Sequence, residues 1–546
     1  MASTSTGNSS SFVEIGTTIK SALNEWENAR SVLVTTINLY VSACAVLQTA
    51  CARPAYYSNG IEEALATVDF FLETLKLEEE KLRSARTSLT VLRNKSTTLS
   101  RVNKLPPEIL SYVFVLAKSH CVHDEDFGPH GPAAVCTYWR QTATNTPNLW
   151  SHIDIGPGTR ERLAKLLLDR TKDYPIHIHA HELDTDSTDG EPTLEGEAEE
   201  VVKLLEPHIG RVRSLDIQSR SKSSAFIPAM LKMWLFYGSP LFSKSLLVSR
   251  PTSGVLLRVQ AGQTPSVKRT RKTKNADDIL LSLDTLHLQG VTISYNSNAY
   301  RDLTDLRLDL TKEPDSIPIS QLANILSASP AISILKLGGI DIIGEGEWVS
   351  SDPVILGSLK VLKLFGIENN SLRLVLSLIG LPDTPVELSL SFTGYLNIHD
   401  ELVAFFRGAR ISVLHLCSYR ADTNLSPTWL PLSELRTLIL ENHQWNFLSM
   451  RGLGATSSQS TPFPRLTVIL LRCQIGYGYL QTFINNFYVR ELYLEQCVPV
   501  YRGGMSPQVM GDLLFKKYPR LRCCVSDTVD STSRLPCRTV LNDYTK

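Results

Sequence analysis

Three histidines at alternating positions form the densest group of potential metal ligands in this chain. They are His177, His179 and His181, in the segment 176–182 with the sequence IHIHAHE. Alternate residues of a strand share one face, so three imidazoles in this pattern are able to coordinate zinc. The same pattern fits a plain strand whose two isoleucines and alanine face a core while the histidines face solvent. We expect the plain strand and no bound metal.

No other spacing in the sequence points to catalysis. The chain has no GxGxxG or GxxxxGK[ST] phosphate loop, no GxSxG nucleophile motif and no HExxH zinc motif. Cys136 precedes Trp139 in a short predicted helix, where we expect a buried structural thiol rather than a nucleophile. The sequence therefore predicts a protein that is not an enzyme, needs no cofactor and takes no small-molecule substrate.

Composition limits the classes of partner. The chain has 546 residues, with 55 basic and 55 acidic side chains and 10 cysteines. This length predicts several domains or one elongated array of repeats. The balanced charge gives no general attraction to nucleic acid or to membranes. Dilute cysteines without a CxxC pair, and an N-terminus without signal-peptide features, predict a reduced intracellular compartment, cytoplasmic or nuclear.

The N-terminal region has the pattern of two long helices. Residues 1–11 are rich in Ser, Thr and Gly and are expected to be disordered. One helix is predicted over 12–53 and a second over 61–99, separated by a break with Pro, Asn and Gly. Leucines of the second helix recur about every seven residues. We expect an antiparallel hairpin over 12–100, in preference to a coiled coil with a second chain.

Part of the first helix carries no charge. The uncharged stretch runs from Ser31 to Ala52 between two arginines and is long enough to cross a membrane. Polar side chains interrupt it, and each would be costly in lipid. We therefore expect a buried helix and no membrane association. These polar residues are Thr35, Thr36, Asn38, Ser42, Gln48 and Thr49.

Three apolar signatures follow between residues 105 and 150. The first, LPPEIL, opens a helix at a proline and continues as an apolar stripe; the second is VCTYWRQ and the third is NLW. A module of about fifty residues cannot bury so many large apolar groups, so some must face a partner. The positions concerned are Leu105, Pro106, Ile109, Leu110, Val113, Phe114, Val135, Cys136, Trp139, Leu149 and Trp150.

These signatures resemble the F-box, and we assign residues 103–155 to it. The resemblance implies that the listed side chains dock on the Skp-family linker of a cullin–RING ubiquitin ligase. Long helices running directly into the motif resemble F-box proteins of basidiomycete fungi. The segment KSHCVHDEDFGPHGP departs from the compact leucine/aspartate turn that is usual in the family. The alternative is a small helical packing element with no outside partner.

A leucine pattern then recurs to the end of the chain. Three copies fit L-x-x-L-x-L-x-G-[VI], at 283–293, 332–342 and 359–369, with a period of about 27 residues. They resemble leucine-rich repeats, in which alternating leucines stack and a glycine makes the turn after the strand. The next residue is Val291, Ile340 or Ile367, where that family often has Asn or Cys, and only Cys497 matches. Looser copies begin at Val212, Leu303, Val386, Ile411, Leu435, Leu466 and Val489.

The predicted fold class is therefore α+β, with a helical hairpin, F-box helices and an α/β leucine-rich-repeat solenoid over 175–525. The segments 320–329 and 400–409 are predicted returning helices of this solenoid. Inserts are predicted at 182–200, which is acidic, and at 258–278, which contains the basic run SVKRTRKTK. A flexible tail is expected over 526–546. The alternative is a conventional layered α/β domain.

The residues between paired leucines should face solvent on the concave side. The first half of this row is cationic and the second half becomes apolar. The cationic half suits a phosphorylated or acidic target, although Asp305 and Asp309 flank one arginine and an ordinary solvated surface is the alternative. We expect target binding at His287, Arg307, Lys336, Lys363, His415 and Tyr493. The full row is His287, Arg307, Lys336, Lys363, Ser389, His415, Ile439, Leu470 and Tyr493.

Together these patterns predict a substrate-recognition adaptor of an SCF-type ubiquitin ligase. Its partners would be a Skp-family linker, cullin through that linker, and an unidentified target protein. One alternative is a non-catalytic leucine-rich-repeat scaffold acting outside a ligase. Another is a nucleic-acid or chromatin binder that uses the basic run 266–274, although we prefer a bare exposed loop as the explanation of that run.

Overall fold

The chain forms two compact units, residues 1–106 and 107–546. The first is helical, and the second combines helices with a large parallel sheet, so the predicted mixture of helix and strand is confirmed. This computed structural model describes residues 9–51, 59–95, 101–120, 130–156, 161–182, 201–219, 226–250, 257–259, 271–310, 316–344, 353–392, 399–418, 432, 434–445, 466–487, 489–499 and 506–526.

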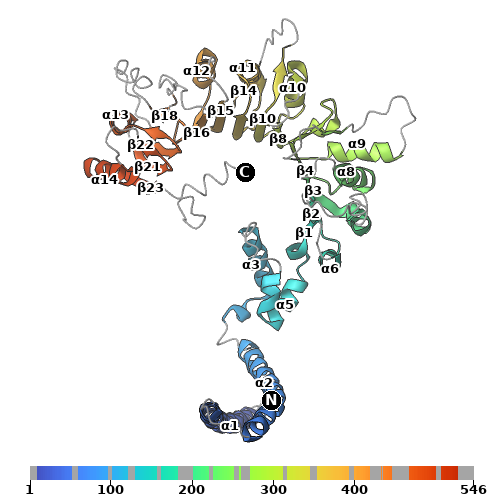
Figure 1. Ribbon diagram of the computed structural model, residues 1–546. Coiled ribbons are helices and arrows are strands. Elements are labelled where there is room, and N and C mark those ends of the chain that lie inside the picture. Colours follow the sequence, from blue (N-terminus) through green and yellow to red (C-terminus); the bar gives the residue numbers. More distant parts are fainter. Residues whose placement is uncertain are drawn as a thin grey trace, which may run out of the picture. The chain divides into compact units, whose positions relative to one another are not determined.

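The first unit consists of α1 (Ser9–Cys51), α2 (Asn59–Lys95) and a short 3-10 helix η1 (Arg101–Lys104) (Figure 1). Both long helices were expected. Residues 9–11, predicted to be disordered, belong to α1, while residues 1–8 lie outside the described part of the chain.

The apolar side chains of α1 are exposed. No side chain from Thr18 to Ala50 is buried. Within the part of the chain that the structure describes, α1 is the one helix that is long and apolar enough to cross a membrane. The expectation of a buried helix is therefore wrong for the chain by itself. Leucines of the expected seam on α2, including Leu72 and Leu82, are exposed as well, so the hairpin packing stays a prediction.

The second unit begins with a small helical module. It contains α3 (Pro107–His120), α4 (His130–Val135), α5 (Thr137–Thr144) and the 3-10 helix η3 (Pro147–Trp150). The chain enters the first strand of the large sheet only two residues after Trp150. Of the unusual segment 118–132, residues 121–129 lie outside the described residues, and its two ends belong to α3 and α4.

Within the described residues the large sheet has fourteen strands, which lie in chain order and pair in parallel, each with its neighbours in that sheet. The strands are β1 (His152–Ile155), β2 (Ile176–Glu182), β3 (Val212–Ser219), β4 (Ser245–Ser249), β6 (Thr285–Gln289), β8 (Asp305–Asp309), β10 (Ile334–Gly338), β13 (Val361–Phe365), β15 (Val386–Phe392), β16 (Ile411–Ser418), β17 (Thr437–Glu441), β19 (Leu466–Leu471), β21 (Val489–Glu495) and β23 (Arg522–Ser526).

Helices connect many of these strands, and α10, α11 and α12 lie together on one side of the sheet (Figure 1). Helices were expected at 320–329 and 400–409, and α10 and α12 form there. The connecting helices are α6 (Glu161–Arg170), α8 (Phe226–Tyr237), α9 (Arg271–Leu281), α10 (Ile319–Ser327), α11 (Asn369–Leu378), α12 (His399–Arg407), α13 (Tyr477–Phe487) and α14 (Pro507–Lys517).

Short outer strands form smaller parallel sheets. Strands β5 (Leu257–Val259) and β7 (Val291–Ile293) pair, as do β9 (Ser316–Pro318) with β11 (Asp341–Ile343) and β12 (Val354–Ile355) with β14 (Ile379–Gly380). A three-stranded sheet joins β18 (Gln444–Trp445), β20 (Gln474–Ile475) and β22 (Val498–Pro499).

Leucines at every second position form the core of the large sheet. Leu306, Leu335 and Leu362 are register partners on successive strands and are fully buried. The second leucine of each strand, Leu308, Leu337 or Leu364, is at most 2% exposed. Burial on one face of each strand explains why the period-two pattern was readable in the sequence.

The residue after a strand repeatedly adopts a left-handed conformation. A side chain at Gly290 would bring its Cβ within 2.4 Å of the Arg250 carbonyl oxygen, so glycine is required there. Later units place non-glycine residues at the same point. The left-handed positions are Gly290, Gly339 and Gly366, with φ of 60–63°, and Asn442, Arg472 and Gln496, with φ of 51–59°.

The residue after each left-handed position is buried, and in three later repeats its side chain bonds to the strand of the preceding repeat. Cys473 Sγ donates to the Leu440 carbonyl oxygen at 3.3 Å, and Cys497 Sγ donates to that of Leu470 at 3.2 Å. His443 Nε2 lies 3.1 Å from the carbonyl oxygen of Leu416. The expectation that only Cys497 fits this position is wrong, because Cys473 and His443 make the same kind of contact.

Several expected boundaries differ from the structure. The sheet begins at His152, inside the expected F-box range, and β4 and β23 were not predicted. Residues 271–278 of the expected insert 258–278 belong to α9 (Arg271–Leu281), so the end of the basic run, 271–274, is helical. Ile279 and Leu280, just after the insert, are buried. Glu182 and Ser526 end strands, whereas 183–200, 260–270 and 527–546 lie outside the described residues.

Candidate functional site

Helix α3 has two apolar faces, of which one is buried and the other is exposed. Leu110 and Phe114 are 0% and 2% exposed and fill the core of the helical module. On the opposite face, Ile109, Tyr112, Val113 and Leu116 are 50%, 63%, 43% and 43% exposed. Their spacing of three and four residues aligns them along one side of the helix. An exposed apolar stripe of this kind is typical of an interaction surface.

The buried face of α3 is held by specific contacts. The rings of Phe114 and Trp139 lie 5.0 Å apart between centroids. Trp150 Nε1 donates to the Ala143 carbonyl oxygen at 2.7 Å, and the guanidinium of Arg170 lies 4.3 Å above the Trp150 ring. Lys118 Nζ donates to the Leu149 carbonyl oxygen at 2.8 Å, and burial lowers the pKa of Lys118 to about 8.

These contacts correct part of the predicted docking surface. Leu110, Phe114, Leu149 and Trp150 are core residues that a partner cannot reach, because the module uses them to pack against itself. Cys136 caps α5: its Sγ accepts from the Trp139 N–H at 3.4 Å. The accessible predicted residues are Pro106, Ile109, Val113 and Val135, with Leu105 and Trp139 partly buried.

Tyr112 and Leu116 were missed, although their helical spacing from Ile109 was visible in the sequence. Leu116 extends the exposed stripe along α3 by nearly a turn beyond Val113, and Tyr112 lies between Ile109 and Val113. We call Ile109, Tyr112, Val113 and Leu116 the docking stripe.

The second candidate site is the face of the large sheet opposite the leucine core, here called the open face. Its central row contains one residue from each strand, and neighbours in the row are register partners. Leu470 was wrongly included, because Ile469 pairs with Ile439 and with Tyr493 while Leu470 faces the core. The row from β1 to β23 is Asp154, His179, Asp216, Leu247, His287, Arg307, Lys336, Lys363, Ser389, His415, Ile439, Ile469, Tyr493 and Cys524.

The three alternating histidines lie on this face, while Ile176, Ile178 and Ala180 are buried as predicted. His179 Nδ1 lies 3.0 Å from Asp154 Oδ1, and this hydrogen bond raises the pKa of His179. His177 and His181 do not converge with His179 on one position that a metal ion could occupy.

His177 stacks on His152, with ring centroids 4.5 Å apart, and burial lowers the pKa of both rings. The ring of His181 lies against Gly156, where an added Cβ would meet it at 2.4 Å. Among the described residues no group of three or more His, Cys, Asp or Glu side chains is arranged to hold a metal ion.

The next part of the row contains a shared carboxylate. Asp305 accepts from Arg307 Nε at 3.0 Å and Nη2 at 2.8 Å, and its Oδ2 lies 3.1 Å from His287 Nε2. Burial raises the pKa of Asp305, but the bonds from His287 and Arg307 outweigh it and lower the pKa. The predicted neutralisation of Arg307 is confirmed for Asp305, whereas Asp309 Oδ2 accepts from Gln289 Nε2 at 3.0 Å.

Lys336 and Lys363 follow on β10 and β13, and they are not solvated as expected. Their exposed fractions are only 8% and 6%. Burial, and then the charge of Arg307, lowers the pKa of Lys336. Burial, and then the charge of Lys336, lowers the pKa of Lys363 to about 7.

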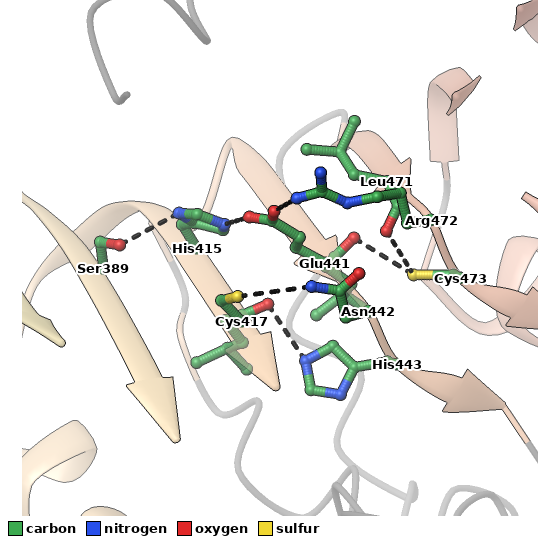
Figure 2. A network of polar contacts seen from close by, with 11 residues as sticks. Ser389, His415, Cys417, Glu441, Asn442, His443, Leu471, Arg472 and Cys473 are labelled. Carbon is green, nitrogen blue, oxygen red and sulfur yellow. Dashed lines mark hydrogen bonds and ion pairs between the residues drawn. The ribbon is translucent and has the colours of Figure 1, made fainter. Parts of the chain in front are cut away.

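A relay of polar side chains follows the lysines (Figure 2). Ser389 Oγ lies 3.0 Å from His415 Nδ1, and His415 Nε2 lies 3.0 Å from Glu441 Oε2. Arg472 also contacts Glu441. Burial, and then the charge of Lys363, lowers the pKa of His415 to about 4, so this ring is neutral at pH 7. The contacts then fit one tautomer, with Ser389 donating to Nδ1 and Nε2–H donating to Glu441.

Chemically, this relay is able to accept a proton from Ser389, as in a nucleophile–base pair. However, β15 is hydrogen-bonded along both edges, to β13 and β16, so the backbone N–H groups beside Ser389 are engaged in the sheet. An acyl-transfer site needs donors aimed at a developing oxyanion. The relay is better explained as a bridge that joins three strands.

The apolar end of the open face is closed. Ile439, Ile469 and Leu471 are 0%, 2% and 8% exposed, and Val413 and Tyr493 pack against them. The expectation of a solvent-facing apolar half is therefore wrong. Side-chain packing between neighbouring strands removes these residues from contact with a ligand.

Comparison of the chain with protein-family models and with curated proteins finds no match.

Proposed function

We propose that this chain is a substrate-recognition adaptor of an SCF-type ubiquitin ligase, acting in the cytoplasm or nucleus. Residues 103–155 resemble an F-box and would dock on a Skp-family linker, and through it on cullin. The observation that carries the proposal is the docking stripe, because α3 fills its own core with Leu110 and Phe114 yet exposes a second apolar face. Buried apolar anchors dominate the energy of protein interfaces.

We propose further that the large sheet is a leucine-rich-repeat solenoid that holds the target. Its support is the parallel order of strands along the chain, the stacked leucines, and the left-handed residue after the strand. The contacts from His443, Cys473 and Cys497 to the preceding unit add to this support. The adaptor would act by raising the local concentration of target near the ligase, without chemistry of its own.

The docking stripe gives a direct test. The full chain carrying Ile109→Asp and Val113→Asp should lose about 100-fold or more in affinity for a purified Skp-family linker, measured by calorimetry. Its thermal unfolding should stay close to that of the wild type, since both side chains are exposed. Leu241→Asp is the matched control, because Leu241 is 85% exposed on another surface. Equal binding by the docking-stripe variant and the wild type would refute the proposal.

The scaffold alternative is separated by a second measurement. An adaptor that binds the linker should also co-purify with cullin and support ubiquitin transfer to a bound protein. Linker binding without cullin would favour a role outside the ligase.

A further inference from the structure

Two buried thiol groups lie next to each other near the carboxyl end of the large sheet. Cys473 directly precedes β20, and Cys497 directly precedes β22. Both are free thiols, and they are 0% and 3% exposed. The two thiol groups are hydrogen-bonded to each other. A pair of thiols in contact within a folded chain is the arrangement from which a disulfide forms when an oxidant is supplied.

The register of two sheets fixes this pair. In the large sheet Leu471 pairs with Glu495, and in the three-stranded sheet Gln474 pairs with Val498. Each of these pairs is 24 residues apart in the chain, as are the two cysteines, which therefore lie opposite each other. The Val498 N–H donates to the Cys473 carbonyl oxygen at 2.8 Å. Neighbouring parallel strands are about 4.8 Å apart, within the Cα separation of about 4.4–6.8 Å that a disulfide spans.

The other contacts of the two thiols are easily exchanged. Cys473 Sγ lies 3.3 Å from the Leu440 carbonyl oxygen and 3.4 Å from that of Leu471 (Figure 2). Cys497 Sγ lies 3.2 Å from the Leu470 carbonyl oxygen. A thiol is a weak hydrogen-bond donor, so replacing these contacts by a covalent bond between the two sulfurs removes little stabilisation.

The two thiols are not equivalent. The hydrogen bond from Cys473 lowers the pKa of Cys497, whereas the same bond and burial raise the pKa of Cys473. Cys497 also adjoins Val498, which is 59% exposed and belongs to β22, the outermost strand of the three-stranded sheet in the described residues. A strand of two residues at a sheet edge opens readily. Cys497 is therefore both the better nucleophile and the thiol that a reagent reaches first.

We propose that Cys473 and Cys497 are a reversible modification site, at which a low-molecular-weight disulfide converts the two thiols into a disulfide bond. The Cys497 thiolate attacks one sulfur of the reagent, which gives a mixed disulfide and releases one thiolate. Cys473 Sγ then loses its proton and attacks Cys497 Sγ, and the second thiolate leaves. The two cysteine protons end on the two released thiolates, so the protein pair is oxidised by two electrons and the reagent is reduced.

The bond would restrain the carboxyl end of the sheet. It would close a loop that contains α13 and β21, so these elements could no longer separate from β19. Opposite residues of parallel strands place their Cβ atoms about 4.8 Å apart, whereas a disulfide prefers about 3.8 Å. The bond would therefore be strained and easily reduced, which suits a reversible modification in a compartment rich in thiols. This inference does not depend on the proposed adaptor function.

The test treats the folded full chain with oxidised glutathione at about pH 8, where a useful fraction of thiol is ionised. Free thiols are then blocked, and peptides are mapped by mass spectrometry without reduction. The peptide that links Cys473 to Cys497 should form, and millimolar reduced glutathione should remove it. Hydrogen exchange at the Val498 amide should slow by about ten-fold or more in the oxidised chain.

Single variants test the order of attack. Cys473→Ser should accumulate a glutathione adduct on Cys497, because no second thiol can displace it. Cys497→Ser should leave Cys473 unmodified, since that thiol is fully buried. A serine hydroxyl preserves a hydrogen-bond donor at either position. Cys417→Ser is the matched control and should form the linked peptide like the wild type, because Cys417 is also buried but lies on β16, outside the pair.

Four results would overturn the inference in whole or in part. A folded wild type that lacks the linked peptide while the exposed Cys44 takes up glutathione has no such site. The same conclusion follows if the linked peptide forms only after unfolding in urea. Equal modification of Cys473 in Cys497→Ser and of Cys497 in Cys473→Ser overturns the order of attack. A linked peptide that resists millimolar reduced glutathione overturns reversibility.

Discussion

Arg307, Lys336 and Lys363 of the open face are here called the cationic group. The docking stripe and the cationic group are built in opposite ways. The docking stripe consists of apolar side chains from one helix of 14 residues, and it is exposed. The cationic group consists of charged side chains from three separate strands, and its lysines are nearly buried. Each therefore places side chains in the environment that is less favourable to them.

The difference indicates where binding free energy would come from. At the docking stripe, a partner would gain by removing apolar surface from water, which depends little on pH or salt. At the cationic group, a ligand would gain by neutralising charges that the fold has already desolvated, which depends on both.

The largest expected effect tests the two faces of α3 against each other. Phe114→Ala should lower the free energy of unfolding by about 3–5 kcal/mol, because it removes a buried ring that packs on Trp139. Ile109→Ala should change it by about 0.5 kcal/mol or less. Urea denaturation of both variants measures the difference. Comparable losses would mean that Ile109 belongs to the core.

The next effect concerns the turns that fix the open face. Gly290→Ala should destabilise the chain by about 2 kcal/mol or more, since φ is positive and the added Cβ would meet the Arg250 carbonyl oxygen. Asn442→Gly, at the corresponding turn after β17, should be neutral within about 1 kcal/mol. Thermal unfolding compares the two variants. A harmless Gly290→Ala would show that this turn does not constrain the register.

A smaller effect follows from Lys363. Its pKa is about 7 in the folded chain and ordinarily 10.5, so between these values the unfolded state holds a proton that the folded state has released. The free energy of unfolding should therefore rise with pH across this window. Lys363→Met should flatten the rise, whereas Lys244→Met should preserve it. Denaturation at pH 7, 8 and 9 distinguishes the variants, and an unchanged slope in Lys363→Met would contradict burial of this charge.

The smallest effect concerns His179, which is more exposed than the lysines. Its pKa is raised by the bond to Asp154, so its stabilising contribution is present at low pH and is lost as pH rises through that pKa. Asp154→Asn should remove this dependence at a cost below about 1 kcal/mol, because Asp154 is largely exposed. Titration of the His179 ring by NMR checks the direction, and an unshifted pKa in the variant would refute the assignment.

Elements with a clear local period were predictable from the sequence. The spacing within α3 and the alternating leucines of β6, β10 and β13 reflect burial on one face, which leaves a direct trace in residue order. Strand β4 was missed because SLLVS does not repeat the pattern of its neighbours. Leu470 was placed in the row instead of Ile469 because β19 is apolar along nearly its whole length, so alternation there gives no register.

The parts that were not predictable depend on contacts between distant residues. No local pattern distinguishes Leu110, which is buried, from Ile109, which is exposed, because both are apolar and adjacent. Ser389, His415 and Glu441 come from three strands, and only the register brings them together. The same holds for the burial of Lys336, which in the sequence resembles any strand lysine facing solvent.

The order of the fourteen strands, which follows the chain without exception, has a mechanical consequence. A pulling force applied at the carboxyl end would load β23 first, then β21 and then β19, since each described strand of the large sheet is bonded to its predecessor and successor in that sheet. Rupture would then proceed as a series of small steps, in the manner of a zipper, rather than as one cooperative event. Extraction of the chain from its carboxyl end would therefore dismantle the cationic group late, after β15 and every strand that follows it had been peeled away.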